Sequence, residues 1–291
     1  MRSAEQFRKL LDGPGLIQIP GCYDCITATI VERSGFPSAY LTGSGISLTL
    51  SGIPDMNTIS YLELRQVVQN IRCAVQIPML VDIDTGFGAP LNLYRLTKEF
   101  EWMDIAAVQI EDQKVPKKCG HELGRKLVSD HEMVQRIRTI SENRQKDGLV
   151  IVARTDARTV VGLEEAIRRG RLYLESGADV VFVESPESYD EVKQITAGIP
   201  GPVLFNNVEG GRSPFLSRKE LEDAGVKIAI YPNAQTRVVA KKCMELLRTL
   251  RESGTTAGMD DQMLSHKELW SMFNSEKWVE IERKYTTPDA P

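Results

Sequence analysis

Eight short apolar runs recur along the chain, and stretches with helical periodicity separate them. Most runs are continuously apolar rather than alternating, as expected of parallel strands that helices cover on the outside. Eight strand–helix units within about 240 residues predict an α/β fold, a (β/α)8 TIM barrel. An open doubly wound sheet is the alternative, but no Gly-x-Gly-x-x-Gly sequence follows the first run. The runs span residues 16–20, 39–42, 79–84, 107–112, 149–154, 180–184, 203–207 and 228–231.

The segments between the runs have the periodicity of amphipathic helices. Met133, Ile137 and Ile140, for example, share one helical face. Three of these segments end in a glycine shortly before the next apolar run, a position that suits a left-handed helix cap. These glycines are Gly35, Gly177 and Gly225.

The last part of the chain has a different character. Residues 255–260 have the composition of a linker, and the segment after them is too apolar for a free tail. We therefore expect a barrel domain over residues 1–253 and a helical extension over residues 254–291, which packs on the barrel or on a partner subunit. The apolar residues of the extension are Leu264, Leu269, Trp270, Met272, Phe273 and Trp278.

The composition excludes several classes of protein. The 291 residues carry 36 Lys+Arg against 40 Asp+Glu, a net charge of −4 with no basic cluster, so we expect no nucleic-acid partner. No run approaches the roughly 18 apolar residues of a membrane span, and the N-terminus lacks the apolar core of a signal peptide. Five cysteines without a framework spacing argue against a disulfide-stapled secreted domain. We expect a cytoplasmic globular protein.

Acidic residues end the third and fourth predicted strands. Functional groups of a TIM barrel gather at the carboxyl ends of its strands and in the loops that follow. Asp82 and Asp84 are two residues apart, so on a strand both carboxylates would point to the same side, and Glu111 ends the next strand. Such oxygen ligands, with no His or Cys ligand set nearby, favour Mg2+ or Mn2+ over zinc. The alternative is that these acids cap helices or solvate loops.

The loop after the fourth strand, residues 114–126, places a thiol among cationic side chains. Cys119 follows Lys117 and Lys118, and His121 stands two positions later. Nearby positive charge lowers the pKa of a thiol and makes it a usable acid or base, while the glycines of the loop would let it open and close. A solvated basic loop with an incidental thiol is the alternative.

Arginines and further polar residues follow the later strands. Arg154 ends the fifth strand and Arg237 comes just past the eighth, and both suit recognition of carboxylate or phosphate. Together with acids for a divalent metal they indicate a polyanionic substrate, although either arginine alone could serve a structural ion pair. Glu184, Asn206 and Glu209 follow the sixth and seventh strands. Asp55, after the second, could reach the same end of the barrel, and a structural role in a turn is an equal alternative.

These motifs resemble those of the isocitrate lyase/phosphoenolpyruvate mutase superfamily over nearly the whole chain. The KKCGH stretch is the most specific of them and marks the carbon–carbon lyase branch, whereas the phosphonate-mutase members have Asn-Ser in place of the cysteine. The segments that carry the resemblance are residues 20–24 (PGCYD), 40–45 (YLTGSG), 82–88 (DIDTGFG), 110–113 (IEDQ), 117–121 (KKCGH) and 153–157 (ARTDA).

The resemblance implies a Mg2+-dependent lyase, with Mn2+ as a possible substitute, that cleaves a 2-hydroxy di- or tricarboxylate to an α-keto acid and a carboxylate. Cys119 would protonate the carboxylate enolate and Arg154 would bind a substrate carboxylate. The resemblance does not identify the base that takes the hydroxyl proton, for which Tyr40 is a candidate. By resemblance, the metal site comprises Asp82, Asp84, Asp55, Glu111 and Glu184, the catalytic group Cys119, Arg154, Lys117 and His121, and the substrate site Tyr40, Thr42, Gly43, Ser44, Asn206, Glu209 and Arg237.

Two departures from the family pattern bear on the substrate. Residues 42–44 read TGS where lyases more often have SGG, and residues 206–211 (NNVEGG) look more like the 2,3-dimethylmalate lyase and petal-death members than the 2-methylisocitrate lyases. We therefore favour small 2-alkylmalates. An oxaloacetate hydrolase of the same family and a non-catalytic ligand-binding barrel are the alternatives. The resemblance also implies a homotetramer whose subunits exchange C-terminal helices.

Overall fold

The computed structural model describes residues 1–120, 122 and 124–286. The chain forms two compact units, Met1–Gln235, here called the barrel unit, and Thr236–Pro291, here called the C-terminal unit. This division precedes the boundary that we expect from the sequence between residues 253 and 254, and the assignment of domains stays a prediction.

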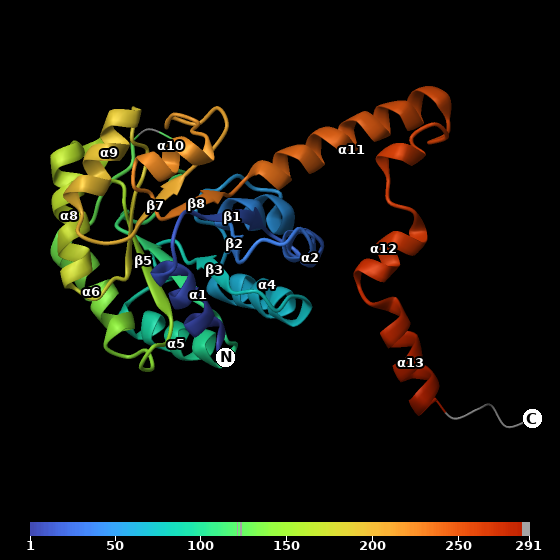
Figure 1. Cartoon of the computed structure of the whole chain (residues 1–291), viewed down its shortest axis with the longest axis horizontal. Coiled ribbons are helices and arrows are strands. Elements are labelled where there is room, and N and C mark those ends of the chain that lie inside the picture. Colours follow the sequence, from blue (N-terminus) through green and yellow to red (C-terminus); the bar gives the residue numbers. More distant parts are fainter. Residues whose placement is uncertain (121, 123, 287–291) are drawn as a thin grey trace, which may run out of the picture. The chain divides into compact units, whose positions relative to one another are not determined.

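The barrel unit contains a closed barrel of parallel strands (Figure 1). Each strand pairs with the next along the chain, and β1 pairs with β8. The predicted TIM barrel is therefore confirmed, and the alternative of an open sheet is wrong. The strands are β1 (Ile17–Cys22), β2 (Ala39–Leu41), β3 (Met79–Asp82), β4 (Ala107–Glu111), β5 (Val150–Thr155), β6 (Val180–Val183), β7 (Val203–Asn206) and β8 (Ile228–Tyr231).

Apolar side chains from these strands pack together in one buried cluster. Tyr40 of β2 stands beside Leu80 of β3, and Phe182 of β6 beside Leu204 of β7. Phe7, from the helix that precedes β1, belongs to the same cluster and is fully buried. A filled interior leaves polar residues to gather where the strands end, which is how barrels of this kind position their sites.

Helices follow the strands and begin at polar capping residues. The side chains of Asp24, Ser60 and Ser188, for example, each accept a hydrogen bond from the backbone N–H three residues later. The predicted caps Gly35, Gly177 and Gly225 have φ of 78°, 105° and 78°, a left-handed conformation that glycine adopts without strain. The helices here are α1 (Ser3–Asp12), α2 (Cys25–Arg33), α3 (Gly43–Ile46), η1 (Ser47–Ser51), α4 (Tyr61–Ala74), α5 (Pro90–Trp102), α6 (Asp130–Ser141), α7 (Ala157–Val160), α8 (Leu163–Glu175), α9 (Tyr189–Gly198) and α10 (Arg218–Asp223).

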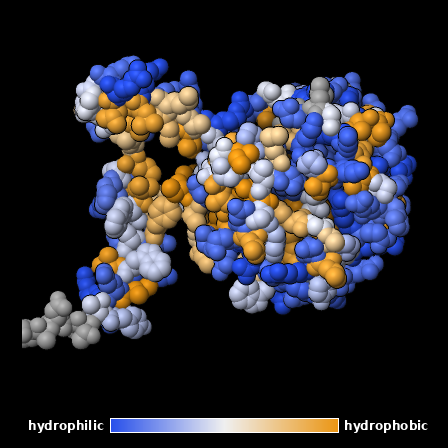
Figure 2. All heavy atoms as spheres, turned by 180° about the vertical axis from the view of Figure 1, so that it is seen from behind, coloured by the Kyte–Doolittle hydropathy of each residue, from blue (hydrophilic) through white to orange (hydrophobic). Residues whose placement is uncertain are grey.

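The C-terminal unit is helical, and much of its apolar surface is exposed. Its elements are α11 (Ala234–Ser253), which begins in the last residues of the barrel unit, η2 (Asp260–Gln262), α12 (His266–Met272) and α13 (Ser275–Tyr285). Trp270 and Trp278 are 55% and 67% exposed, and Figure 2 shows hydrophobic residues on the surface of these helices. The exchange of these helices between subunits stays a prediction. Within the described ranges, no helix combines the length and apolarity that a membrane crossing requires.

Candidate active site

One cavity at the carboxyl ends of the strands brings together most of the polar residues that the sequence singled out. Parallel strands of a barrel all end at the same face, so residues distant in sequence meet there. Cys119 lies in the wall of this cavity with Arg154 of β5 and Asp82 of β3. The other predicted residues in its wall are Tyr40, Thr42, Ser44, Asp55, Glu184 and Asn206.

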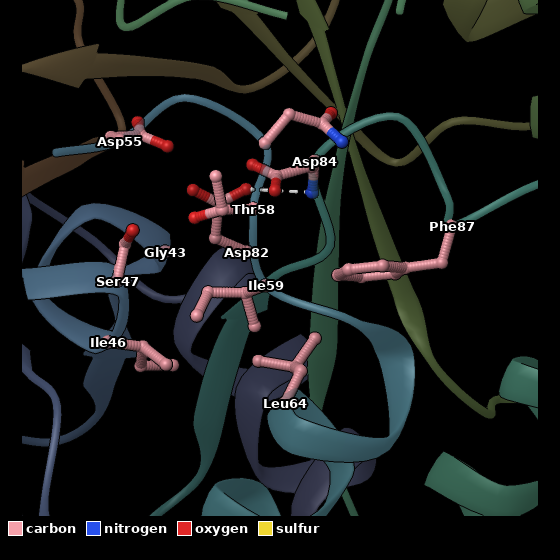
Figure 3. Close-up of a pocket in the computed structure, with 11 residues that line it drawn as sticks. Gly43, Ile46, Ser47, Asp55, Thr58, Ile59, Leu64, Asp82, Asp84 and Phe87 are labelled. Carbon is pink, nitrogen blue, oxygen red and sulfur yellow. Dashed lines mark hydrogen bonds between the residues drawn. The ribbon is translucent and has the colours of Figure 1, made fainter. Parts of the chain in front are cut away.

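An adjoining cavity exposes the acidic residues from a second side (Figure 3). Asp55 and Asp82 line both cavities, and Asp84 lines this one. Figure 3 shows the three carboxylates grouped at one end, with the apolar side chains of Ile59 and Leu64 at the other.

Asp82 and Asp84 reach this space by a route that differs from the sequence prediction. β3 ends at Asp82, and Asp84 lies beyond it with a φ of 48°, so the two are not neighbours on one face of a strand. The prediction that strand alternation aligns them is wrong. A turn brings the two carboxylates together instead, and within it the backbone N–H of Asp84 donates to Asp82 Oδ1 at 3.1 Å. The left-handed residue reverses the chain and returns the second carboxylate to the cavity.

Gly43 leaves room in front of these two carboxylates. A Cβ atom at this position would lie 3.1 Å from Asp82 Oδ2 and 3.5 Å from Asp84 Oδ1. Any side chain would therefore occupy the space that the carboxylates face. The glycine keeps open a small, oxygen-lined space at the end of β3.

Lys117 introduces a buried positive charge among the acids. Its ammonium group bonds to Asp55 and lies 2.7 Å from Asp84 Oδ1, and its side chain is 3% exposed. Burial works to lower the pKa of Lys117, but the surrounding carboxylates, Asp84 above all, raise it well above its usual value. The lysine is therefore charged and holds the loop of Cys119 against the acidic residues.

The buried acids themselves resist ionisation. Burial raises the pKa of Asp82 to about 6, and the nearby Asp84 adds to this while Lys117 and Arg154 oppose it. Burial also raises the pKa of Glu111, against the attraction of Arg154. Buried carboxylates with perturbed pKa values, one of them in the wall of a cavity, are typical of functional sites.

Arg154 is held by carboxylates on several sides. Asp156 accepts from its Nε at 3.0 Å and from its Nη2 at 2.9 Å, while Glu111 and Glu184 lie 3.3 Å and 3.5 Å from the guanidinium group. The guanidinium carbon also lies 5.3 Å from the ring centre of Phe182. A guanidinium fixed in this way presents a preset positive charge to an anionic ligand.

The segment after Cys119 lies directly on these groups. A Cβ on Gly120 would be 2.6 Å from Glu184 Oε2 and 2.7 Å from Arg154 Nη2, and the hydroxyl of Ser185 donates to the Gly120 carbonyl at 3.0 Å. A Cβ atom here would force the Glu184 and Arg154 side chains to shift, so the position favours glycine. The backbone thereby brings Cys119 into the wall of the cavity.

Tyr40 lines the cavity, and a chain of hydrogen bonds links its hydroxyl to Asp82. The hydroxyl donates to Gln109 Oε1 at 3.1 Å, and Gln109 Nε2 donates in turn to Asp82 Oδ1 at 3.2 Å. Burial and the neighbouring Asp82 raise the pKa of Tyr40 well above its usual value. The phenol is therefore neutral and acts as a hydrogen-bond donor.

Gly43 and Asp84 line only the adjoining cavity, while Lys117 and Glu111 contact Asp84 and Arg154 in the walls of the two cavities. The structure assigns three other predicted site residues to neither cavity. Glu209 is exposed in the turn after β7. Arg237 belongs to α11 in the C-terminal unit, and its role at the site stays a prediction. His121 lies outside the described residues.

Sequence reasoning missed several buried charges that support the site. Asp156 and Arg125 form a fully buried ion pair beside Arg154, and Asp112 accepts hydrogen bonds from Arg169 and Tyr173. Asp156 stands two residues after Arg154, a spacing that could have drawn attention to it. Nothing local marks Arg125 as its partner, since the two residues are 31 positions apart.

The oxygen-rich site suits a magnesium ion even though direct ligation by three side chains is not arranged. Among the described residues, no group of three or more His, Cys, Asp or Glu side chains is placed to hold a metal. Magnesium, however, usually takes one or two carboxylates and completes its shell with water and substrate. Glu111 Oε1 is buried and has no hydrogen-bond partner among the described residues, and the space beside Gly43 faces two carboxylates. These features fit Mg2+.

Comparison with known proteins gives extensive matches. The sequence profile of the family described as phosphoenolpyruvate phosphomutase matches residues 7–251. The chain is 42% identical to 2,3-dimethylmalate lyase of Eubacterium barkeri, over 99% of each chain. It is 39% identical to 2-methylisocitrate lyase of Bacillus subtilis (strain 168), over 92% of this chain and 88% of that one.

Solved structures agree with the sequence matches. Oxaloacetate acetylhydrolase bound to the inhibitor 3,3-difluorooxalacetate superposes with a TM-score of 0.92 at 30% identity, over 99% of both chains. The trigonal form of 2,3-dimethylmalate lyase, described as a member of the PEP mutase/isocitrate lyase superfamily, has a TM-score of 0.91 at 31% identity, over 98% of this chain and 95% of that one. Phosphonopyruvate hydrolase in complex with oxalate and Mg2+ has a TM-score of 0.86 at 27% identity, over 98% and 99%.

Proposed function

Because this chain belongs to the phosphoenolpyruvate mutase/isocitrate lyase superfamily, we propose that it is a Mg2+-dependent carbon–carbon lyase. Its substrate would be a 2-hydroxy dicarboxylate of the 2,3-dimethylmalate type, with a tricarboxylate of the 2-methylisocitrate type next in order. The observation that carries the proposal is the position of Cys119, in the same cavity wall as Asp82 and Arg154. In these proposed roles, a proton donor, a carboxylate-binding cation and an acid for the metal would surround one space.

Asp82 and Asp84 would hold the metal, with Asp55, Glu111 and Glu184 supporting its water shell. Bound Mg2+ supplies Lewis acidity, which polarises the hydroxyl and carboxylate oxygens of the substrate. The space that Gly43 leaves open beside Asp82 and Asp84 would receive the dication.

Arg154 would bind the carboxylate on which negative charge develops during cleavage. The bond between the hydroxyl-bearing carbon and its neighbour breaks, and its electron pair passes to the fragment that becomes the carboxylate enolate. Because Asp156 already orients the guanidinium, little reorganisation is needed as this charge forms. Loss of the hydroxyl proton leaves the other fragment as an α-keto acid.

Cys119 would complete the reaction by donating its thiol proton to the enolate carbon. Its loop lies on Arg154 and Glu184, so the thiol is near the charge that it neutralises. Tyr40 is a weak candidate for the base that takes the hydroxyl proton, because its raised pKa keeps the phenol protonated. It suits hydrogen bonding to a substrate oxygen better.

Hydrolysis of oxaloacetate is the second candidate function. The oxaloacetate acetylhydrolase structure superposes on 99% of this chain. In that reaction water adds to a keto group before the carbon–carbon bond breaks, and the same arginine and metal acids would serve it. We favour the lyase because 42% identity links the chain to 2,3-dimethylmalate lyase over its whole length.

A substrate panel tests this proposal. The purified chain with Mg2+ is offered 2,3-dimethylmalate, 2-methylisocitrate, isocitrate, other 2-alkylmalates and oxaloacetate separately, and keto-acid release is followed by coupled assay. Release from a hydroxy acid, abolished by excess chelator and restored by Mg2+ or Mn2+, is expected. Oxalate and acetate from oxaloacetate alone would establish the hydrolase instead. The absence of product from every compound would favour a binding protein without catalysis.

The proposed enzyme would be a cytoplasmic homotetramer that exchanges C-terminal helices. The exposed tryptophans Trp270 and Trp278 support an assembly role for this unit, since large apolar side chains are rarely left in water. Light scattering of the full chain tests the oligomer number.

A further inference from the structure

Asp156 lies between two arginines that serve different parts of the site. It follows β5 directly and is fully buried. Its two oxygens accept from Nε and Nη2 of Arg154 at 3.0 Å and 2.9 Å, a fork that sets the plane of the guanidinium group. Its Oδ1 also accepts from Nη1 of Arg125.

Arg125 connects this carboxylate to the segment that carries Cys119. It lies six positions after the cysteine, and its side chain is 1% exposed. Its second nitrogen, Nη2, donates to Thr159 Oγ1 at 2.6 Å. The arginine is therefore immobilised by two acceptors, one of which also holds Arg154.

A second buried cation holds the same segment on the other side of the cysteine. Lys117, two residues before Cys119, bonds to Asp55 and Asp84. Cys119 thus stands between Lys117, which is bound to the proposed metal acids, and Arg125, which is bound to the partner of Arg154. Both attachments hold the segment, together with the hydrogen bond from the Ser185 hydroxyl to the Gly120 carbonyl and the two bonds between the Gln113 side chain and the Lys118 backbone.

Asp156 is itself fixed by the barrel and its outer helix. Its backbone N–H donates to Asp112 Oδ1 at 2.9 Å, and Asp112 Oδ2 accepts from Arg169 of α8 at 2.9 Å and from Tyr173 at 2.8 Å. Because these hydrogen bonds fix Asp156 to the barrel and to α8, its carboxylate does not move when either arginine moves. It provides a fixed reference for both.

Burial opposes ionisation of Asp156, yet Arg154 and Arg125 hold its pKa below the usual value. The carboxylate is therefore charged while it binds both cations. A neutral amide of the same shape would keep one oxygen acceptor but lose the second, together with the charge.

We propose that Asp156 is a positioning residue that sets the distance between Arg154 and the Cys119 segment, with Arg125 as its link to that segment. The inference rests on the proposed function, since it assigns Arg154 to the substrate carboxylate and Cys119 to proton transfer. Arg125 and Asp156 touch no substrate in this scheme. They act through the two residues that do.

Single substitutions of Arg125 and Asp156 test separately the contact of Asp156 with Arg125 and its contact with Arg154. Arg125→Met leaves Asp156 on Arg154 but removes one buried attachment of the cysteine segment, so kcat for keto-acid release should fall at least about tenfold. Binding of oxalate with Mg2+, measured by calorimetry, should change by less than about threefold, because Arg154 keeps its fork. Asp156→Asn should weaken oxalate binding by about tenfold as well as lower kcat.

A chemical readout follows the thiol without any need for turnover. Iodoacetamide labelling of Cys119 is compared by peptide mass spectrometry with labelling of the exposed Cys73 in the same molecule. In Arg125→Met the ratio should rise by about fivefold or more, since the segment loses a buried attachment. Arg125→Lys, which keeps the cation, should lie between this variant and the wild type.

Arg158→Met serves as the matched control. Arg158 lies on α7 close to Asp156 in sequence, but it pairs with Glu187 and Glu191. Its removal should leave kcat, oxalate binding and the labelling ratio unchanged. Wild-type kcat and a wild-type labelling ratio in Arg125→Met would overturn the inference. If the wild type cleaves none of the hydroxy acids, the proposed function fails. The oxalate-binding and labelling measurements then still test whether Arg125 and Asp156 position the Cys119 segment.

Discussion

Lys117 and Asp84 form a buried ion pair, with 2.7 Å between Nζ and Oδ1. The lysine comes from the loop after β4 and the aspartate from the turn after β3. The same ammonium group bonds to Asp55, which follows β2. One cation from a loop therefore binds two acids from the segments that follow two other strands, and Cys119 lies two residues after it in the chain.

Removing this cation should make stability depend more strongly on magnesium than it does in the wild type. In Lys117→Met, Asp55 and Asp84 lose their shared partner, and an uncompensated buried charge costs about 3 kcal/mol or more. A dication bound to the same carboxylates should restore part of the loss. Urea unfolding in EDTA and in excess Mg2+ measures both effects. The exposed Lys114→Met is the control, and an equal loss under both conditions would contradict the prediction.

Cys119→Ser should abolish turnover while leaving ligand binding intact. A serine hydroxyl is a far weaker acid than a thiol, so kcat should fall by about 10²-fold or more. Oxalate should bind as in the wild type, because Arg154 and the metal acids are untouched. Steady-state kinetics and calorimetry measure these quantities. A variant with full turnover would remove Cys119 from the role of acid.

Gly43→Ala should impair metal binding more than folding. The new methyl group would lie 3.1 Å from Asp82 Oδ2, a close contact that occupies the space in front of the carboxylates. We expect the apparent Mg2+ affinity for activation to fall by about tenfold. Thermal unfolding in EDTA should shift only slightly, because α3 tolerates alanine. Wild-type activation by Mg2+ would show that the metal lies elsewhere.

Glu99 should link stability to pH in the acid range. Burial works to raise its pKa, but hydrogen bonds from Tyr61, Arg95 and Arg65 lower it to about 2. Because the folded pKa lies below the unfolded one, this stabilisation is complete above the unfolded value of about 4.3 and is lost as the pH falls towards 2.

Glu99→Gln tests this linkage. The variant should be less stable than the wild type at pH 7, by on the order of 1–2 kcal/mol, and the difference should shrink between pH 5 and pH 2. Tyr61→Phe, which removes one of the three donors, should show a smaller effect of the same sign. Urea midpoints across this range measure it, and a difference independent of pH would contradict the assignment.

Local sequence patterns predicted the barrel well because each strand–helix unit is itself a local pattern. The expected strand at residues 228–231 coincides with β8, and the others differ at their ends by one or two residues. The largest consequence of such a difference is at Asp84. Strand alternation predicted its direction, whereas a left-handed turn decides it.

The site was predictable only in part, for a related reason. Strand ends could be read from the sequence, so residues such as Asp82 and Arg154 were expected at one face of the barrel. The ion-pair partners of these residues could not be predicted from the sequence. Neither periodicity nor spacing pairs Arg125 with Asp156 or Lys117 with Asp55. The last pair is separated by 62 positions.

The sequence by itself therefore determined the closed barrel and the strand ends at which the polar residues gather, because hydrophobic periodicity and strand alternation act over a few residues. The tertiary structure alone decided which charges meet, which are buried and which backbone positions must be glycine. Those properties depend on distances across the fold. Gly120 illustrates the difference, since only the folded structure shows that a Cβ atom at this position would lie 2.6 Å from Glu184 Oε2.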